Sequence, residues 1–182
     1  FWESILNYFD YIDVSGMKIY QDGMVAEGEI AQKIVEEGVK LGSRNYQLLA
    51  KLLERRAILV KTEDFKLVKE ERNRLVALTQ TKSIIQRLIA LIKYKLVENI
   101  LLNKRDKFIA QKIDETLKHD EAGTIFIGAY HNIKKRLSVD IQIKEIKDSE
   151  KVREYQKLLP FYNKNKKRFE ELGRYLISKV TV

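Results

Sequence analysis

The chain has 182 residues, of which 45% are hydrophobic and 34% are charged, and its formal net charge is +9. This length and balance are typical of one well-buried globular domain and exclude a disordered chain. Cysteine is absent, which excludes disulfides and thiolate metal sites and fits a reducing compartment, so we expect a cytoplasmic location. Because the chain begins at Phe1 rather than methionine, we interpret its natural start as lying upstream, which leaves room for a removed targeting signal or a further strand.

The first third of the chain predicts two strands separated by two helices. The predicted elements are an amphipathic segment at 1–11, strands at 16–20 and 57–61, and helices at about 30–41 and 44–56. Gly42 is a typical C-terminal stop for the first helix, and Ser43 is a typical N-cap for the second.

Residues 65–118 form a long helical segment without glycine or proline, and we expect it to divide into two or more helices or to project as an arm. The polar stretch 79–83 is its weakest point. Aliphatic residues occupy two faces of the helix expected at 84–102, which predicts burial either in the core or against a second copy of the chain. The same stretch contains Arg87, Lys93, Lys95 and Glu98, so we expect no membrane span.

The last third predicts two more strands and a basic end. We expect strands at 123–129 and 140–146, a short helix at 132–136, a helix at 148–159 and a basic helix from 161 to about 178. The strand at 140–146 has one charged face and is predicted at a sheet edge. Residues 1–182 therefore predict a single α/β domain with a small, mostly parallel sheet flanked by helices, and basic helices at 148–179.

Polar residues follow three of the predicted strands. His131 ends an apolar run, Asp22 follows the strand at 16–20, and Glu63 follows the strand at 57–61. Since the carboxyl ends of parallel strands meet at one edge of a sheet, we expect the three side chains to converge there. The sequence therefore predicts a site in which these residues are catalytic, and in which Asp22 and His131 could share a divalent metal.

Each of these residues also has a structural interpretation. His131 could cap the following helix or bond a loop carbonyl, and Asp22 with Gly23 could form only a turn. Glu63 could place favourable charge at a helix N-terminus.

Four further residues are candidates for ligand binding. Gly128 would allow a ligand to approach the backbone closely, and Tyr130 lies between it and His131. Arg44 and Asn45 follow Gly42 and could hold a phosphate or carboxylate, although a lone glycine favours the simpler interpretation that this turn only ends one helix and starts the next. The chain has no GxGxxG, P-loop, HExxH or GxSxG motif.

The helical stretch 104–113 with its Arg105-Asp106 pair, followed by a strand that ends in Gly128-x-x-His131, resembles the TraB/Tiki-like superfamily. Relatives of that superfamily include erythromycin esterases and ChaN-like haem-binding proteins, and other motifs of the chain are similar to those of uncharacterised bacterial proteins. The resemblance implies a hydrolase-like role. Two features depart from the superfamily: its first-strand motif is absent or precedes Phe1, which would leave a metal site incomplete, and no second Gly-x-x-His occurs.

A non-enzymatic role is the alternative hypothesis. The helix at 84–102 would form a homo-oligomer, and the basic C-terminal region would contact an anionic partner. Residues 134–179 hold 14 Lys or Arg against 7 Asp or Glu. This excess attracts polyanions such as nucleic acid, but the interleaved acids favour a solvated surface. The residues whose neutralisation would test nucleic-acid binding are Lys164, Lys166, Lys167 and Arg168.

Overall fold

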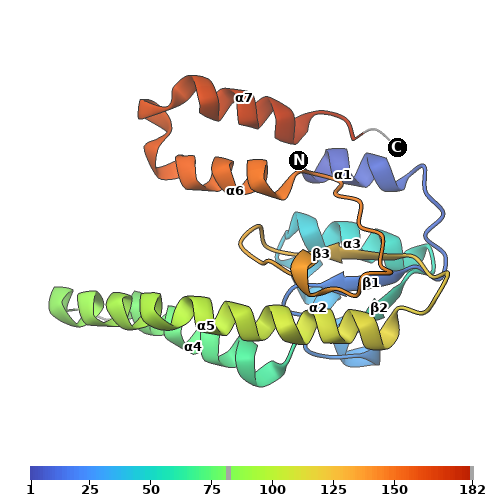
Figure 1. Ribbon diagram of the computed structural model, residues 1–182, viewed down its shortest axis with the longest axis horizontal. Helices are drawn as coiled ribbons and strands as arrows, with labels where there is room; N and C mark the ends of the chain where they lie inside the picture. The colour runs from blue at the N-terminus through green and yellow to red at the C-terminus, as the bar shows by residue number, and fades with distance from the viewer. Residues whose placement is uncertain (81–82, 181–182) are drawn as a thin grey trace.

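The structure is a computed structural model, and it describes residues 1–80 and 83–180 (Figure 1). Three parallel strands form a sheet in the order β2-β1-β3. The strands are β1 (Lys18–Gln21), β2 (Ile58–Val60) and β3 (Gly123–Phe126). In the central strand, Ile19 pairs with Leu59 on one side and Thr124 on the other. The predicted α/β class with a small parallel sheet is confirmed.

Helices cover both faces of this sheet. One layer contains α1 (Trp2–Phe9), α2 (Gly28–Lys40) and α3 (Arg44–Glu54), and the other contains α4 (Phe65–Gln80) and α5 (Ile84–Thr116). Successive residues of β1 point to opposite layers, as the pleat of a strand requires. Ile19 packs with Phe9 and Leu49 in the first layer, whereas Tyr20 packs with Ile109 in the second.

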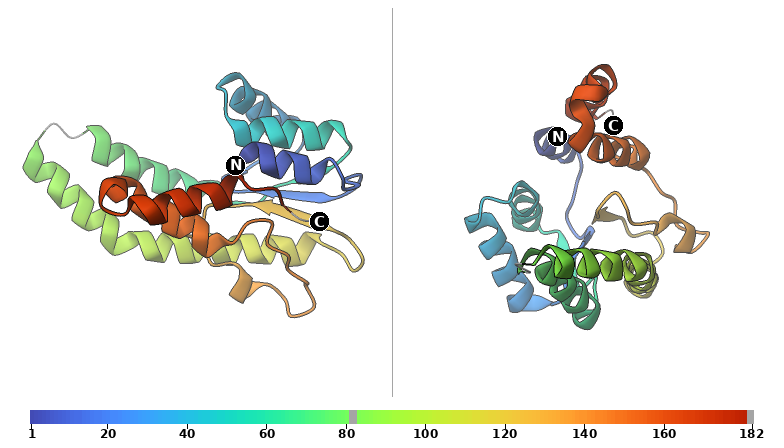
Figure 2. Two further views of the ribbon diagram at one scale, coloured as in Figure 1. Left: turned by 90° about the horizontal axis from the view of Figure 1, so that it is seen from above. Right: turned by 90° about the vertical axis from the view of Figure 1, so that its left-hand side faces the viewer.

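The long helical segment is divided, as its polar stretch predicted. One helix ends at Gln80 and the next begins at Ile84, and residues 81–82 lie outside the described part of the chain. Helices α4 and α5 pack side by side and extend together beyond the end of the sheet (Figure 2). Only the C-terminal part of α5 crosses the sheet, so its N-terminal part keeps large aliphatic residues exposed. No described helix has the length and apolar character needed to cross a membrane.

The predicted fourth strand at 140–146 is wrong, because this segment has no regular secondary structure. Its isoleucines explain why: Ile141 packs against the core beneath α5, whereas Ile146 packs against the core on the opposite face of the sheet. Ile146 follows Ile143 by three residues, so the three isoleucines do not alternate as a strand requires, and the segment passes from the α5 layer to the α1 layer instead of pairing with β3. The strand expected at 123–129 ends at Phe126, and the helix expected at 132–136 is a single 3-10 turn, η1 (Lys134–Arg136).

The C-terminal region is a helical hairpin that lies beyond α1, on the side of the molecule opposite α5 (Figures 1 and 2). It consists of α6 (Ser149–Leu158), a 3-10 turn η2 (Leu159–Lys164) and α7 (Lys166–Ile177). The Asp148 side chain caps α6 by accepting two backbone N–H bonds. Tyr155 of α6 stacks on Phe169 of α7 at 4.6 Å between ring centroids, and the buried Leu172 and Leu176 lie on α7.

Candidate functional site

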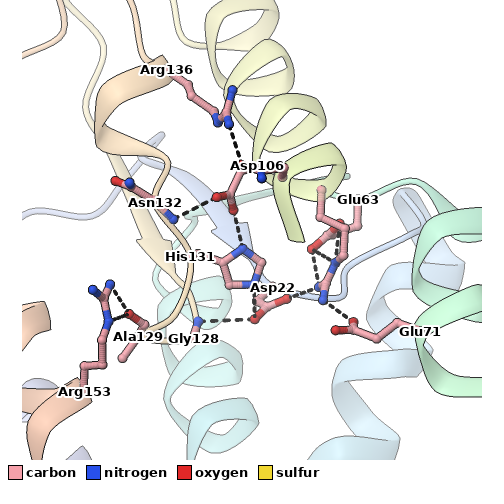
Figure 3. Close-up of polar contacts among 12 residues, drawn as sticks. Asp22, Glu63, Glu71, Asp106, Gly128, Ala129, His131, Asn132, Arg136 and Arg153 are labelled. Atoms are coloured by element: carbon pink, nitrogen blue, oxygen red, sulfur yellow. Dashed lines mark hydrogen bonds and ion pairs between the residues drawn. The ribbon is translucent and has the colours of Figure 1, made fainter. Parts of the chain in front are cut away.

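The structure brings Asp22, Glu63 and His131 together at the carboxyl ends of the three strands (Figure 3). Arg105 of α5 joins two of them, since its Nη2 lies 2.5 Å from Asp22 Oδ1 and 2.5 Å from Glu63 Oε1. His131, the third residue, contacts Asp22 instead: Asp22 Oδ2 lies 3.4 Å from His131 Nε2. Their convergence follows from the parallel sheet, which exposes all strand ends along one edge.

Glu63 is held in place by the turn that follows β1. Its backbone N–H and that of Thr62 both donate to the carbonyl oxygen of Met24, at 3.0 and 2.9 Å. The Thr62 hydroxyl in turn accepts the backbone N–H of Gln21 at 3.1 Å. These bonds tie the ends of β1 and β2 together and leave Glu63 completely buried, with 0% of its surface exposed.

Arg105 is the buried cation of the site and contacts three carboxylates. Its Nε and Nη2 donate to Glu63, Nη2 also donates to Asp22, and Nη1 bonds Glu71 of α4. Burial opposes the charge, but the hydrogen bonds to Glu63 and the surrounding carboxylates raise the pKa of Arg105. Burial also raises the pKa of Glu63 above its ordinary value, although Arg105 opposes that shift. The cluster is stable only as a unit, because each buried charge depends on the others.

His131 lies between two carboxylates that contact opposite nitrogens of its ring. Nδ1 is 2.6 Å from Oδ1 of Asp106, which is buried on α5, and Nε2 faces Asp22. The second oxygen of Asp106 accepts the backbone N–H of Asn132 at 2.9 Å, which fixes the carboxylate relative to the ring. Burial disfavours the imidazolium, but the hydrogen bonds to Asp106 and Asp22 raise the pKa of His131 to about 9.

Asp106, His131 and Asp22 form a chain of contacts that we call the relay. Asp22 is the member of the relay that solvent reaches. Its side chain is 26% exposed, against 5% for His131. Burial opposes its ionisation, yet the hydrogen bond from His131 and the charges of His131 and Arg105 hold the pKa of Asp22 below its ordinary value. The site at neutral pH therefore pairs an ionised carboxylate, open to solvent on one side, with an imidazolium behind it.

The spacing of Gly128 and His131 has a physical role. The Gly128 N–H donates to Asp22 Oδ2 at 3.2 Å, the same oxygen that faces His131 Nε2. A Cβ at position 128 would lie 3.4 Å from that oxygen and 3.5 Å from His131 Cδ2. The loop after β3 thus places one backbone donor and one imidazole on a single carboxylate oxygen.

The other predicted ligand residues are placed differently. Asn45 reaches the edge of the site, because it donates to the Gln21 side chain at 3.0 Å and Gln21 donates to the Asp22 carbonyl. Arg44 is exposed and bonds Gln47 on its own helix. Tyr130 is half-exposed, and its ring lies 6.0 Å from the guanidinium of Arg153 rather than in the relay.

Metal binding by Asp22 and His131 stays a prediction, and the donors present fit it poorly. The described residues hold no group of three or more His, Cys, Asp or Glu side chains arranged to bind a metal ion. Asp22 and His131 face each other as a pair, and the carboxylate of Glu63 is bonded to Arg105. A guanidinium so close to both carboxylates already supplies the positive charge that a divalent ion would bring.

The sequence singles out Arg105 and Asp106 only through the resemblance to the TraB/Tiki-like superfamily, and it does not single out Glu71. A signal was present for the pair, because Leu101, Arg105 and Ile109 follow each other at the four-residue spacing of one helix face. Leu101 and Ile109 are buried, and so are the two charged residues beside them. Charged residues within an apolar helical stripe are costly to bury unless they are paired, so they indicate a site of paired charges.

No protein-family model, no curated protein and no solved structure matches this chain. The resemblance to the TraB/Tiki-like superfamily therefore remains a prediction. The fold and the site define an α/β protein with a carboxylate–imidazole–carboxylate relay at the carboxyl edge of its parallel sheet.

Proposed function

We propose that this site is hydrolase-like and that His131 moves a proton within it. The observation that supports the proposal is the two-sided contact of the imidazole. The buried Asp106 holds Nδ1 at 2.6 Å, so Nε2 is directed toward the solvent-accessible Asp22. A histidine whose second nitrogen is fixed by a buried carboxylate has the orientation that acid–base catalysis requires.

The charge state assigns a role to each residue. With a pKa raised to about 9, His131 is protonated at neutral pH and acts as the acid. Asp22 is ionised and accepts a proton from the attacking water. As water adds to an ester carbonyl, the C–O bond breaks and the Nε2 proton passes to the leaving alcohol oxygen. The proton on Asp22 then returns to His131, and an acid and an alcohol are released.

Removing the imidazole should abolish hydrolysis. For a series of ethyl esters from acetate to octanoate, whose alkoxide leaving group needs a proton, we expect His131→Ala to lower kcat/KM by about 10²-fold or more, the range of general acid catalysis. The matched control is His119→Ala, since His119 is exposed and its Nδ1 lies 2.9 Å from the equally exposed Asp120, away from the site. Titration of the released carboxylic acid measures the rate, and above pH 9 the wild-type rate should fall as His131 deprotonates. Equal rates for the wild type and His131→Ala would contradict the proposal.

Exposed aliphatic residues on α5 favour a second candidate function, assembly through a second copy of the chain. Among the side chains that the structure describes within 85–100, six of these aliphatic residues are each at least 44% exposed: Ile85, Leu88, Ile89, Leu91, Ile92 and Ile100. Exposed aliphatic side chains gathered on a projecting helix are costly to leave in water, and the same side chains on a second α5 would cover them. This proposal retains the interface predicted for 84–102.

A charge among these side chains should dissociate the assembly. We expect the wild type to sediment as a dimer at micromolar concentration and Ile92→Glu to sediment as a monomer, because the carboxylate would be buried against aliphatic side chains. Ile30→Glu is the control, since Ile30 is also exposed (65%, against 52% for Ile92) but lies on α2. A monomeric wild type, or a dimer that persists in Ile92→Glu, would contradict this candidate.

Nucleic-acid binding by the basic region stays a prediction. Arg168 pairs with Glu154 and Glu171, and Lys166 lies 3.9 Å from Glu170, so half of the four predicted contact residues have acidic partners. These ion pairs reduce the positive potential that a phosphate backbone would meet.

A further inference from the structure

A cavity of about 640 Å³ lies beside the edge of β3, next to the relay. It exists because the segment after η1 crosses the sheet edge instead of pairing with β3, so a space remains between the segment and the strand. His131 and Gly128 belong to its wall. Its volume lies within the roughly 300–1,000 Å³ that is typical of small-molecule sites.

Both helical layers and the crossing segment contribute apolar walls. Trp2 comes from α1, Ile113 comes from α5, and Ile133, Leu137 and Ile141 come from the segment that follows β3. Such walls suit a hydrocarbon chain, because binding would remove apolar surface of both partners from water.

The charged residues around this cavity are mostly cationic. Its wall includes five Lys or Arg residues and two acids: Lys134, Lys135, Lys144, Lys147, Arg153, Glu145 and Glu150. One cation is neutralised, because Lys134 pairs with Glu145. By contrast, Lys147 donates to the carbonyl oxygens of Tyr175 and Ser178, and Arg153 donates to that of Ala129. An anionic group would therefore find cations that carbonyl dipoles only partly satisfy.

We propose that this cavity binds an amphipathic carboxylate, with its acyl chain against the apolar walls and its head group near the cations. In the hydrolase-like role proposed above, on which this assignment of substrate rests, the bound molecule would be the acyl part of an ester and then the carboxylate product. The cavity and the relay share His131, so the ester group of an acyl chain in the cavity would lie where His131 and the loop after β3 form the wall.

Binding of octanoate, measured by calorimetry in the absence of turnover, tests the cavity directly. We expect octanoate to bind the full chain at least about tenfold more tightly than either acetate, which lacks the chain, or 1-octanol, which lacks the charge. Leu137→Trp should weaken octanoate binding about tenfold or more, because the indole would occupy part of the cavity. Val139→Trp is the matched control, since Val139 lies in the same segment but is fully exposed and outside the cavity wall.

The head group is tested by a second pair of variants. Arg153→Gln should weaken octanoate binding about threefold and leave 1-octanol binding unchanged, because Arg153 contacts the loop that carries His131. Lys151→Gln should change neither, because Lys151 is not part of the wall. Circular dichroism and thermal unfolding establish that each variant is folded.

The outcomes separate this inference from the proposed function. Octanoate binding that His131→Ala retains, together with an absence of ester hydrolysis by the wild type, would overturn the proposed function and leave the cavity assignment standing. Ester hydrolysis without octanoate binding would overturn the cavity assignment alone. Equal octanoate affinity in Leu137→Trp and Val139→Trp, or equal affinity for octanoate and 1-octanol, would also overturn it.

Discussion

Replacing Arg105 with methionine should destabilise the protein by about 3–5 kcal/mol, the usual cost of removing one partner from a buried ion pair. Glu63 is completely buried and would lose its guanidinium partner. Asp22 and Glu71, which share that partner, would then repel each other and Glu63. Urea unfolding at pH 7 measures the free energy of unfolding, and the loss should shrink at acidic pH, where protonation neutralises the carboxylates.

Two controls make this prediction specific. Arg74→Met removes an arginine that pairs with Glu70 within α4 and is partly exposed, so it should cost only about 0.5 kcal/mol. Adding Glu63→Gln to Arg105→Met removes the stranded charge and should recover part of the lost stability. If Arg105→Met costs no more than Arg74→Met, the buried cluster does not contribute to stability as described.

The free energy of unfolding should fall as pH rises from about 6.5 to 9, by about 3 kcal/mol at roughly 1.4 kcal/mol per pKa unit. The folded protein raises the pKa of His131 from its ordinary 6.5 to about 9. A raised pKa means that the folded state binds the proton more tightly than the unfolded state. The contribution is therefore complete below pH 6.5 and is lost as pH rises through 9.

Two measurements check this pH dependence. Urea unfolding at several pH values should show the decline for the wild type and for His119→Gln, and no such decline for His131→Gln. In NMR titrations the His131 ring proton should shift with a midpoint near pH 9. A His131 midpoint near 6.5, or the same pH dependence in His131→Gln as in the wild type, would show that Asp106 and Asp22 do not stabilise the imidazolium.

Local sequence patterns were sufficient to predict the α/β class and the three strands that the structure contains. Alternation and short apolar runs mark β1, β2 and β3, because a buried strand must be apolar where it meets the helices. The same patterns predicted a fourth strand at 140–146, which was wrong. Ile141 and Ile143 alternate with polar residues as in a strand, but Ile146 breaks this alternation and packs against the other face of the sheet from Ile141. Periodicity alone does not distinguish a segment that follows an edge from one that crosses it.

The candidate site, too, could be predicted only in part from the sequence. The sequence by itself placed Asp22, Glu63 and His131 after separate strands, and parallel pairing was enough to expect them at one edge. Only the tertiary structure decided what holds them there. Arg105 and Asp106 come from a helix more than 40 residues away from Glu63 in the chain, and their roles depend on how α5 crosses the sheet. Strand ends are local features of sequence, whereas the pairing of buried charges requires the relative placement of distant elements, which no local pattern specifies.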